Sequence, residues 1–209
     1  MLIAIYKLLN KNASMKITLV LLLTGLGVFG IWKFVLGRKP VVKINQPVSV
    51  ATSELLDQCI QKLNSKEKLC LKDFKGKKIL LVNVASECGF TKQYKDLEQL
   101  YQTHKDKLVI IGFPCNQFAG QESGTEEEIE KFCSSKFNVT FPLTTKISVK
   151  GDNQHPIYAW LTQKSKNKVS DYSVTWNFNK FLVDENGQLI GYFSSKVNPM
   201  DASITDLLK

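Results

Sequence analysis

The chain has 209 residues and a formal net charge of +9, which is enough length for one domain with a hydrophobic core and an additional segment. Residues 1–53 hold seven of the 28 basic residues and no acidic residue, so that 21 basic residues face 19 acidic ones in the remainder. A nucleic-acid-binding domain would carry its basic excess on the folded part, and we exclude nucleic acid as a partner. The five cysteines contain no C-x-x-C pair, which argues against a disulfide scaffold and a tetrahedral zinc site.

The first 52 residues predict a membrane anchor. Residues 1–16 form a basic flank, and residues 17–36 are apolar apart from Lys33 and about long enough to cross a bilayer core of ~30 Å. We expect a single-pass transmembrane helix and a membrane localisation on an undetermined side, because basic residues flank both ends. A cleaved signal peptide is the alternative, although no small-residue cleavage site follows. Residues 37–52 are predicted to be a linker and residues 53–209 a folded domain.

The first elements of this domain lead to a central strand. Residues 53–63 have the pattern of a short helix, and residues 66–73 predict a small strand and a turn. Residues 79–85 form a short apolar run that is typical of a fully buried strand. A helix is predicted from residue 94 to residue 104, where apolar side chains recur at helical spacing.

Cys88 lies in the polar turn between this strand and this helix. Ligands of open α/β sheets bind at the carboxyl ends of strands, and a helix N-terminus favours a thiolate over a thiol. Cys88 is therefore the leading candidate nucleophile, although a lone cysteine is also common as a small buried residue. Cys59 and Cys70 lie in a less regular region, and we expect them to be structural.

A second buried strand at residues 107–113 predicts a parallel pair with the first, and it also ends in a polar turn. Residues 114–125 of that turn would emerge at the same sheet edge as Cys88. Thr125 and Glu128 then match a capping box, which opens a helix that carries Cys133. A cysteine on a helix is most often packed in the core.

The C-terminal part predicts a helix that begins at Pro156, a hairpin and a short final helix. The strands of the hairpin are expected at residues 174–183 and 189–193, with an Asn-Gly turn between them. The final helix is expected at residues 201–208. These elements predict an α/β domain with a mixed central sheet flanked by helices.

Three stretches together resemble the signature of the glutathione peroxidase family: Asn83-Val-Ala-Ser-Glu-Cys-Gly, Phe113-Pro-Cys-Asn-Gln-Phe-Ala-Gly-Gln-Glu and Trp176-Asn-Phe-Asn-Lys-Phe-Leu. The resemblance covers about residues 71–208 and implies a thioredoxin-like fold. It implies a thiol peroxidase of the cysteine type that takes part in the response to oxidative stress. Neither a metal nor a cofactor is implied.

The resemblance also assigns roles to individual residues. Cys88 matches the peroxidatic position, and Gln121, Trp176 and Asn177 match the other members of the catalytic tetrad. Neutral donors of these types suit a thiolate that must be stabilised and still remain nucleophilic. Cys133 matches the resolving cysteine of thioredoxin-dependent members, whereas Cys115 is a family position that usually does not resolve.

The implied cycle forms a sulfenic acid on Cys88 and then a disulfide with Cys133, which thioredoxin or glutathione reduces. We expect the Cys133 helix to unwind for this step, because a disulfide needs Cα atoms within ~7 Å. The short segment between Trp160 and Trp176 resembles members without the oligomerisation loop. It predicts a monomer that accepts bulky hydroperoxides, including lipid ones near the expected anchor.

Two other functions stay open at this point. A membrane-tethered thiol-disulfide oxidoreductase or copper chaperone would combine the same fold with an anchor, but both need closely spaced cysteines. A peroxide-sensing redox relay would use oxidation of Cys88 as a signal. The two histidines, His104 and His155, lie outside the motif turns, which argues against a Cys-His hydrolase.

Overall fold

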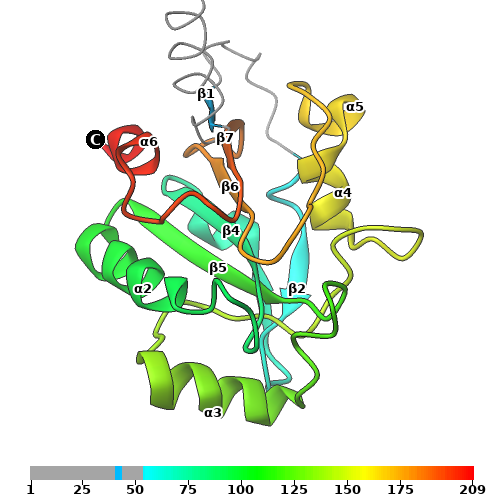
Figure 1. The fold of residues 1–209 in the computed structure, drawn as a ribbon. Coiled ribbons are helices and arrows are strands. Elements are labelled where there is room, and N and C mark those ends of the chain that lie inside the picture. The colour runs from blue at the N-terminus through cyan, green and yellow to red at the C-terminus, as the bar shows by residue number, and fades with distance from the viewer. Residues whose placement is uncertain (1–40, 44–53) are drawn as a thin grey trace, which may run out of the picture. The chain divides into compact units, whose positions relative to one another are not determined.

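The structure is a computed structural model, and it describes residues 41–43 and 54–209. The chain divides into two units, Met1–Lys39 and Pro40–Lys209, and every described residue belongs to the second. Its main sheet has five strands in the order β1-β7-β6-β4-β5 (Figure 1). The strands are β1 (Val41–Lys43), β4 (Lys78–Val84), β5 (Leu108–Pro114), β6 (Lys180–Val183) and β7 (Leu189–Phe193).

The sheet is mixed, as the sequence predicts. β4 and β5 are parallel and in register from the pair Lys78–Leu108 to the pair Val84–Pro114. The pairs β4–β6, β6–β7 and β1–β7 are antiparallel. The parallel pair therefore brings the residues that follow β4 and β5 to one edge of the sheet.

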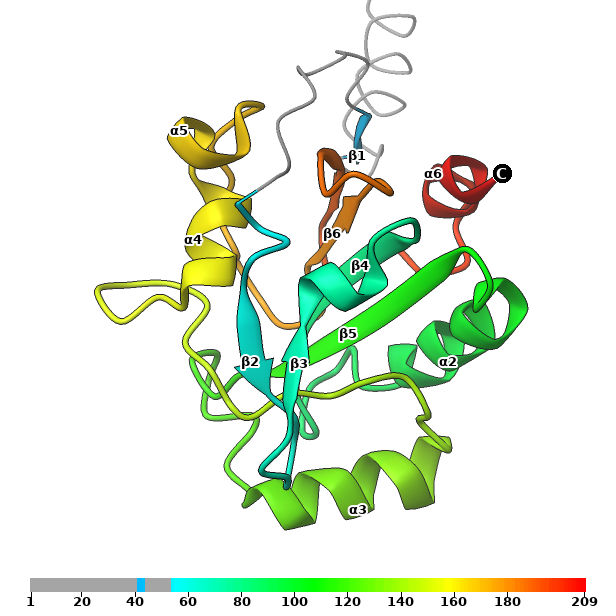
Figure 2. The same cartoon turned by 180° about the vertical axis from the view of Figure 1, so that it is seen from behind.

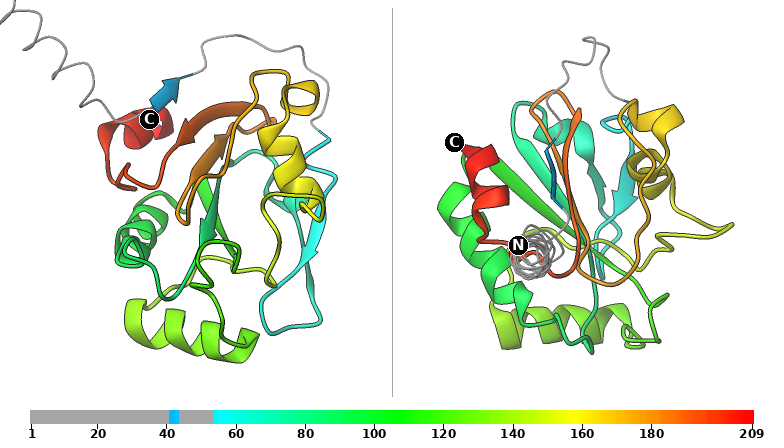
Figure 3. Two further views of the ribbon diagram at one scale, coloured as in Figure 1. Left: turned by 45° about the vertical axis from the view of Figure 1, so that its right-hand side comes forward. Right: turned by 45° about the horizontal axis from the view of Figure 1, so that its top comes forward.

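Alternate side chains of β4 pack into two cores on opposite faces of the sheet. Ile79 and Leu81 pack in one core with helix α4 (Pro156–Thr162), which is followed by α5 (Lys164–Asn167). Leu80 and Val82 pack in the other with helices α2 (Gln93–His104), α3 (Glu126–Phe137) and α6 (Ala202–Thr205), the last continued by η2 (Asp206–Leu208). Figure 2 shows the first face with strands β2 (Cys59–Gln61) and β3 (Lys68–Cys70) in front, and Figure 3 shows α2 and α6 on the opposite side of the sheet from α4.

The helix predicted at residues 53–63 is wrong over the residues that the structure describes. Strand β2 (Cys59–Gln61) pairs with β3 (Lys68–Cys70) in a two-stranded hairpin, and η1 (Leu71–Phe74) follows. Ile60 and Leu69 face each other in this pair and are buried, so strand pairing prevails over the helical spacing. The small strand expected within residues 66–73 is confirmed at β3, and a turn at residues 75–76 leads to β4 as expected.

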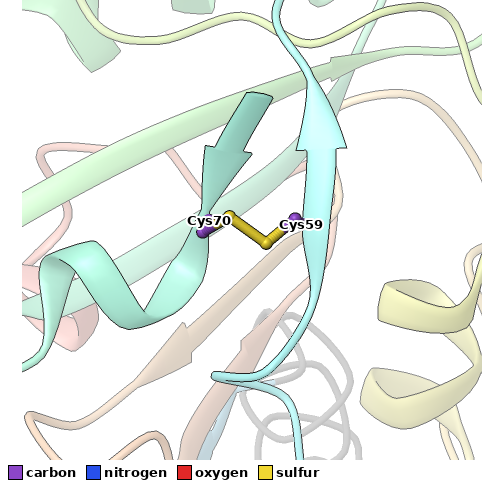
Figure 4. The surroundings of a disulfide bond; sticks show 2 residues. All are labelled: Cys59 and Cys70. Atoms are coloured by element: carbon purple, nitrogen blue, oxygen red, sulfur yellow. A yellow bond between two sulfur atoms is a disulfide. The ribbon is translucent and has the colours of Figure 1, made fainter. Parts of the chain in front are cut away.

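Cys59 and Cys70 also lie opposite each other in the hairpin and form a disulfide, with Cα atoms 4.0 Å apart (Figure 4). The sequence predicts structural roles for both but not this pairing. The bond joins the two strands at the end where the hairpin meets η1. The disulfide therefore closes the loop between residues 59 and 70, and it does not involve Cys88.

The starts of α2, α3 and α4 agree with the predicted positions, whereas the strand predicted from residue 174 begins later than expected. Thr125 caps α3 with the predicted capping box, because its side chain accepts from the Glu128 N–H while the Glu128 carboxylate accepts from the Thr125 N–H. Pro156 opens α4, and α2 covers the predicted range. β6 begins only at Lys180, since residues 175–179 form a loop that binds the end of β4.

The expected membrane anchor at residues 17–36 lies outside the described residues. Within residues 41–43 and 54–209, no helix is long and apolar enough to cross a bilayer. The two longest helices there have 12 residues and rise about 18 Å, against a bilayer core of ~30 Å. We correct the expectations of a transmembrane helix in the fold and of a membrane localisation accordingly, and we retain the thioredoxin-like domain.

Candidate active site

Cys88 lies in the turn between β4 and α2 and is 8% exposed. Its backbone N–H donates to Oγ1 of Thr91 at 2.9 Å, and that hydroxyl donates to the carbonyl of Ala85 at 2.8 Å. The backbone N–H of Phe90 points at the Cys88 sulfur, with a distance of 3.4 Å between the nitrogen and Sγ. The turn thus fixes the thiol and offers a hydrogen-bond donor to negative charge on its sulfur.

Helix α2 begins only at Gln93, five residues after Cys88. The sequence predicts a start at residue 94 and an effect of the helix dipole on the thiol, but the dipole acts mainly within the first turn of a helix. In the structure the turn itself supplies the donor, through the Phe90 N–H. Thr91 is a positioning residue of this turn that the sequence analysis missed, although a threonine three residues after a turn cysteine is a recognisable local hydrogen-bonding signal.

The Gln121 turn lies directly against the Cys88 turn. The backbone N–H of Glu87 donates to the carbonyl of Gln121 at 3.0 Å. The side-chain amide of Asn177 donates to Oε1 of Gln121 at 3.1 Å. Three segments far apart in the sequence therefore meet at the predicted edge of the sheet.

Asn83 holds the segment that carries Trp176 and Asn177. Its side chain donates to the carbonyl of Trp176 at 2.9 Å and accepts from the backbone N–H of Asn179 at 3.1 Å. Its backbone carbonyl accepts from the N–H of Phe178 at 2.6 Å. Asn83 is fully buried on β4, where a side-chain amide without hydrogen-bond partners would destabilise the fold. In the sequence it can be recognised as the single polar residue within the apolar run 79–85.

Trp176 and Asn177 differ strongly in their exposure. Trp176 is 36% exposed, and its ring lies 5.8 Å from that of Phe118, centroid to centroid. Asn177 is completely buried. Among the described residues, no hydrogen bond joins the sulfur of Cys88 to the side chains of Gln121, Trp176 or Asn177, so their expected action on the sulfur remains a prediction. Oε1 of Gln121 is occupied by Asn177, which leaves the Gln121 NH₂ group as a donor.

Cys133 lies on α3 and is 1% exposed. It packs in the same core as Cys88, and both are free thiols. Burial raises the pKa of Cys133 to about 11, and a negative charge on Glu122 contributes to this increase. The Tyr94 hydroxyl has no hydrogen-bond partner by geometry, but it lies near enough to the thiol for the two groups to affect each other's pKa.

Cys115 is a free thiol on the opposite side of the sheet. It packs with Phe113 and Tyr158 in the core beneath α4, away from the core of Cys88 and Cys133. Burial raises the pKa of its thiol. This placement separates Cys115 from the other two thiols.

Two cavities flank the Cys88 turn. One, of about 420 Å³, is lined by Phe90, Trp176 and Lys196 with three hydroxyl residues, Thr175, Ser194 and Ser195. The other, of about 340 Å³, is lined by residues of the Cys88 turn, the Gln121 turn and α3, namely Ser86, Glu87, Glu122, Ser123, Gly124, Glu128, Ile129 and Phe132. The thiol turn is thus bordered on one side by an aromatic cavity and on the other by an acidic one.

Among residues 54–209, no group of three or more histidine, cysteine, aspartate or glutamate side chains is arranged to hold a metal ion. The arrangement resembles that of a thiol enzyme: a buried thiol follows a parallel strand, the turns that carry Gln121 and Asn177 lie beside it, and a second thiol lies on a neighbouring helix. Together with the mixed sheet and its flanking helices, it defines the class of thioredoxin-like redox enzymes.

Comparison with known proteins gives the family. A family model described as glutathione peroxidase matches residues 56–162. The chain is 51% identical over 129 residues to the glutathione peroxidase-like peroxiredoxin GPX5 of Chlamydomonas reinhardtii, a match that covers 61% of this chain and 79% of the relative. It is 43% identical over 137 residues to the hydroperoxy fatty acid reductase gpx1 of Synechocystis sp., covering 63% of this chain and 81% of the relative.

A solved structure supports the same assignment. The crystal structure of Trgpx in apo form superposes with a TM-score of 0.59 at 36% identity, covering 76% of this chain and 97% of that chain. The chain belongs to the glutathione peroxidase family, and it is a peroxidase of the cysteine type.

Proposed function

We propose that this peroxidase works with two cysteines, Cys88 as the peroxidatic thiol and Cys133 as the resolving thiol. The observation that carries the first assignment is the convergence on the Cys88 turn of the Gln121 turn and the Asn177 loop, through the Glu87–Gln121 and Asn177–Gln121 hydrogen bonds. Cys88 is the free thiol at this convergence.

In the first step the Cys88 thiolate attacks the outer oxygen of the hydroperoxide. An S–O bond forms, the O–O bond breaks, and the leaving oxygen departs as alkoxide or hydroxide, which takes up a proton to give alcohol or water. The Phe90 N–H stabilises the thiolate. The Gln121 NH₂ group and the Trp176 indole N–H are the neutral donors available for the charge that develops on the leaving oxygen.

In the second step Cys133 attacks the sulfenic sulfur of Cys88. Seven of the twelve residues of α3 are exposed, and the helix is held on one face only, where Ile129 and Cys133 are buried and Phe132 and Phe137 pack partly buried against the same core. Local opening of such an element costs less free energy than global unfolding. This shallow packing supports the expectation that α3 unwinds to bring Cys133 to Cys88.

The aromatic cavity supports organic hydroperoxides as substrates. It adjoins Cys88 because Phe90 lines it and also donates its N–H to the sulfur. Phe90 and Trp176 offer apolar contacts, and the exposed ammonium of Lys196 suits an acidic head group such as that of a fatty-acid hydroperoxide. A relative is named a hydroperoxy fatty acid reductase, which agrees with this substrate class.

The reductant that we propose is thioredoxin or a similar dithiol protein, because an intramolecular disulfide is a suitable target for a dithiol. Glutathione is the second candidate. The segment between α4 and the Trp176 loop contains only the short helix α5, which supports a monomer with an accessible site.

Steady-state peroxide consumption tests this assignment. With thioredoxin as reductant, we expect Cys133→Ser to lose nearly all turnover, while the control Cys115→Ser retains it because Cys115 packs on the opposite face of the sheet. Unchanged turnover in Cys133→Ser would exclude Cys133 as the resolving residue. A wild-type protein that is oxidised once and not turned over by either reductant would favour the peroxide-sensing relay instead.

A further inference from the structure

Glu122 is a buried carboxyl group that the proposed cycle does not use. It follows Gln121 directly and is 1% exposed, and neither of its carboxylate oxygens has a hydrogen-bond partner by geometry among the described residues, although Ser86 lies near enough to lower its pKa. A buried carboxylate without partners is costly, so its presence requires an explanation. Its position supplies one.

The acidic cavity lies between the segments that carry the two thiols. Ser86 and Glu87, which immediately precede Cys88, line one part of it, and Ile129 and Phe132 of α3 line another. Glu122 lines the same cavity. The carboxyl group is therefore placed between the peroxidatic turn and the helix of the resolving thiol.

The proton affinities of Glu122 and Cys133 are linked. Burial raises the pKa of Glu122 from 4.5 to about 7, and Glu87 adds to the increase, while Ser86 and Lys146 oppose it. The negative charge of Glu122 in turn opposes ionisation of Cys133. If the proton of the thiol moves to the carboxylate, the pair still holds one negative charge, and the repulsion that disfavours two charges does not arise.

We propose that Glu122 is the proton acceptor for Cys133 in the disulfide-forming step. This inference rests on the proposed function, because it presupposes that Cys133 resolves the sulfenic acid. Glu122 takes the proton of the Cys133 thiol, and the thiolate forms an S–S bond with the Cys88 sulfur. The S–O bond of the sulfenic acid breaks, and the departing hydroxide takes the proton from Glu122, which restores the carboxylate and releases one water.

The other groups around Glu122 are less suited to this task. Glu87 and Glu128 line the cavity but are exposed. The Lys146 ammonium donates to the carbonyl of Gly124 at 2.8 Å. Burial raises the pKa of the Tyr94 hydroxyl far above its ordinary value, so it stays protonated.

Cys115 also interacts electrostatically with Glu122, but it packs in the opposite core. Glu122 is consequently the buried group next to α3 that changes its protonation near neutral pH. A base with such a pKa accelerates proton transfer most effectively at that pH.

Single-turnover kinetics of the full-length reduced enzyme test the proposal. One equivalent of hydrogen peroxide is added, samples are quenched with an alkylating reagent, and mass spectrometry follows the Cys88 sulfenic acid and the Cys88–Cys133 disulfide separately. We expect Glu122→Gln to form the sulfenic acid at the wild-type rate and the disulfide about 10²-fold more slowly at neutral pH. The matched control is Glu87→Gln, which removes an exposed carboxylate from the same cavity and keeps the backbone N–H bonded to Gln121; because Glu87 contributes least to the pKa of Glu122, the rate of disulfide formation should change far less than in Glu122→Gln.

The pH profile separates a proton acceptor from a merely structural residue. In the wild-type protein the rate of disulfide formation should rise with an apparent pKa near 7, as Glu122 loses its proton, and then level off. In Glu122→Gln this step should disappear, and the rate should keep rising toward the pKa of Cys133. If the variant does not fold, a wild-type profile without a step near 7 overturns the proposal by itself.

Other outcomes are equally decisive. Disulfide formation in Glu122→Gln at or above the wild-type rate would overturn the inference, since Glu122 would then act only by opposing the ionisation of Cys133. If the wild-type protein forms no Cys88–Cys133 disulfide, the proposed function fails and the inference fails with it. A wild-type disulfide with an unchanged Glu122→Gln rate overturns the inference alone.

Discussion

Glu122→Gln should change how the stability of the folded domain depends on pH. Burial raises the pKa of this carboxyl from 4.5 to about 7 in the folded protein, so the folded state binds a proton more tightly than the unfolded chain between these two values. The stability associated with this proton is present below pH 4.5 and is lost as the pH rises through about 7. A glutamine does not titrate, and the variant therefore lacks this loss.

The size of the effect follows from the shift. One pKa unit corresponds to about 1.4 kcal/mol, so the shift of Glu122 is equivalent to roughly 3 kcal/mol as an upper bound. Residual solvent access from the adjoining cavity reduces this value. Relative to wild type, we expect Glu122→Gln to gain about 2–3 kcal/mol of unfolding free energy between pH 4.5 and pH 8.

Urea denaturation at constant ionic strength and several pH values measures this difference. The hairpin disulfide is kept oxidised throughout, so that it makes the same contribution in both proteins. Glu87→Gln is the control, because Glu87 is exposed and its loss should leave the pH dependence almost parallel to wild type. Parallel curves for wild type and Glu122→Gln from pH 4.5 to pH 8 would refute the argument that the buried carboxyl resists ionisation.

Three further variants test other parts of the proposed structure and mechanism. Thr125→Ala removes the cap of α3 and should lower the free energy of unfolding by about 1 kcal/mol. Because the helix then opens more readily, the Cys88–Cys133 disulfide should form faster in stopped-flow experiments. Slower formation would argue against unwinding. Replacing both Cys59 and Cys70 with serine should lower the unfolding free energy by roughly 2–3 kcal/mol in urea denaturation and leave peroxide turnover intact; lost turnover would give the disulfide a catalytic role. Asn83→Ala removes the side-chain hydrogen bonds to the Trp176 loop. It should lower the free energy of unfolding by about 2–3 kcal/mol and reduce peroxide turnover about tenfold or more. Wild-type turnover would show that these hydrogen bonds are dispensable.

The sequence predicts the central elements of the fold well because their signals are local and mutually consistent. The apolar runs of β4 and β5 and the capping box at Thr125 each have one favoured structure, and the parallel pairing follows from the helix between the strands. The sequence also places the Gln121 turn at the sheet edge of Cys88, and the family resemblance adds Asn177 to this group; the Glu87–Gln121 and Asn177–Gln121 hydrogen bonds agree with both expectations.

Other features depend on contacts between distant residues that spacing does not reveal. The β2–β3 hairpin forms because Ile60 and Leu69 pair across it and because Cys59 meets Cys70, whereas the local pattern resembles a helix. Glu122 is buried in the folded domain, where it lines a cavity together with residues of α3, whereas a Gln-Glu pair in a turn normally indicates exposure.

The loop before β6 also depends on contacts between residues that are distant in the sequence. Residues 175–179 look like the first half of a strand, but the polar side chain of Asn83 binds their backbone and holds them out of the sheet. The tertiary fold determines which backbone groups a buried asparagine binds, and the spacing of residues in the sequence does not predict them.

The most direct test of the account is to trap the oxidised cysteine. Reduced Cys133→Ser is treated with one equivalent of hydrogen peroxide in the presence of dimedone, and peptide mass spectrometry locates the adduct. We expect one equivalent of sulfenic acid on Cys88, and we expect Cys88→Ser to consume no peroxide. An adduct on Cys115 instead, or undiminished peroxide consumption by Cys88→Ser, would contradict the account.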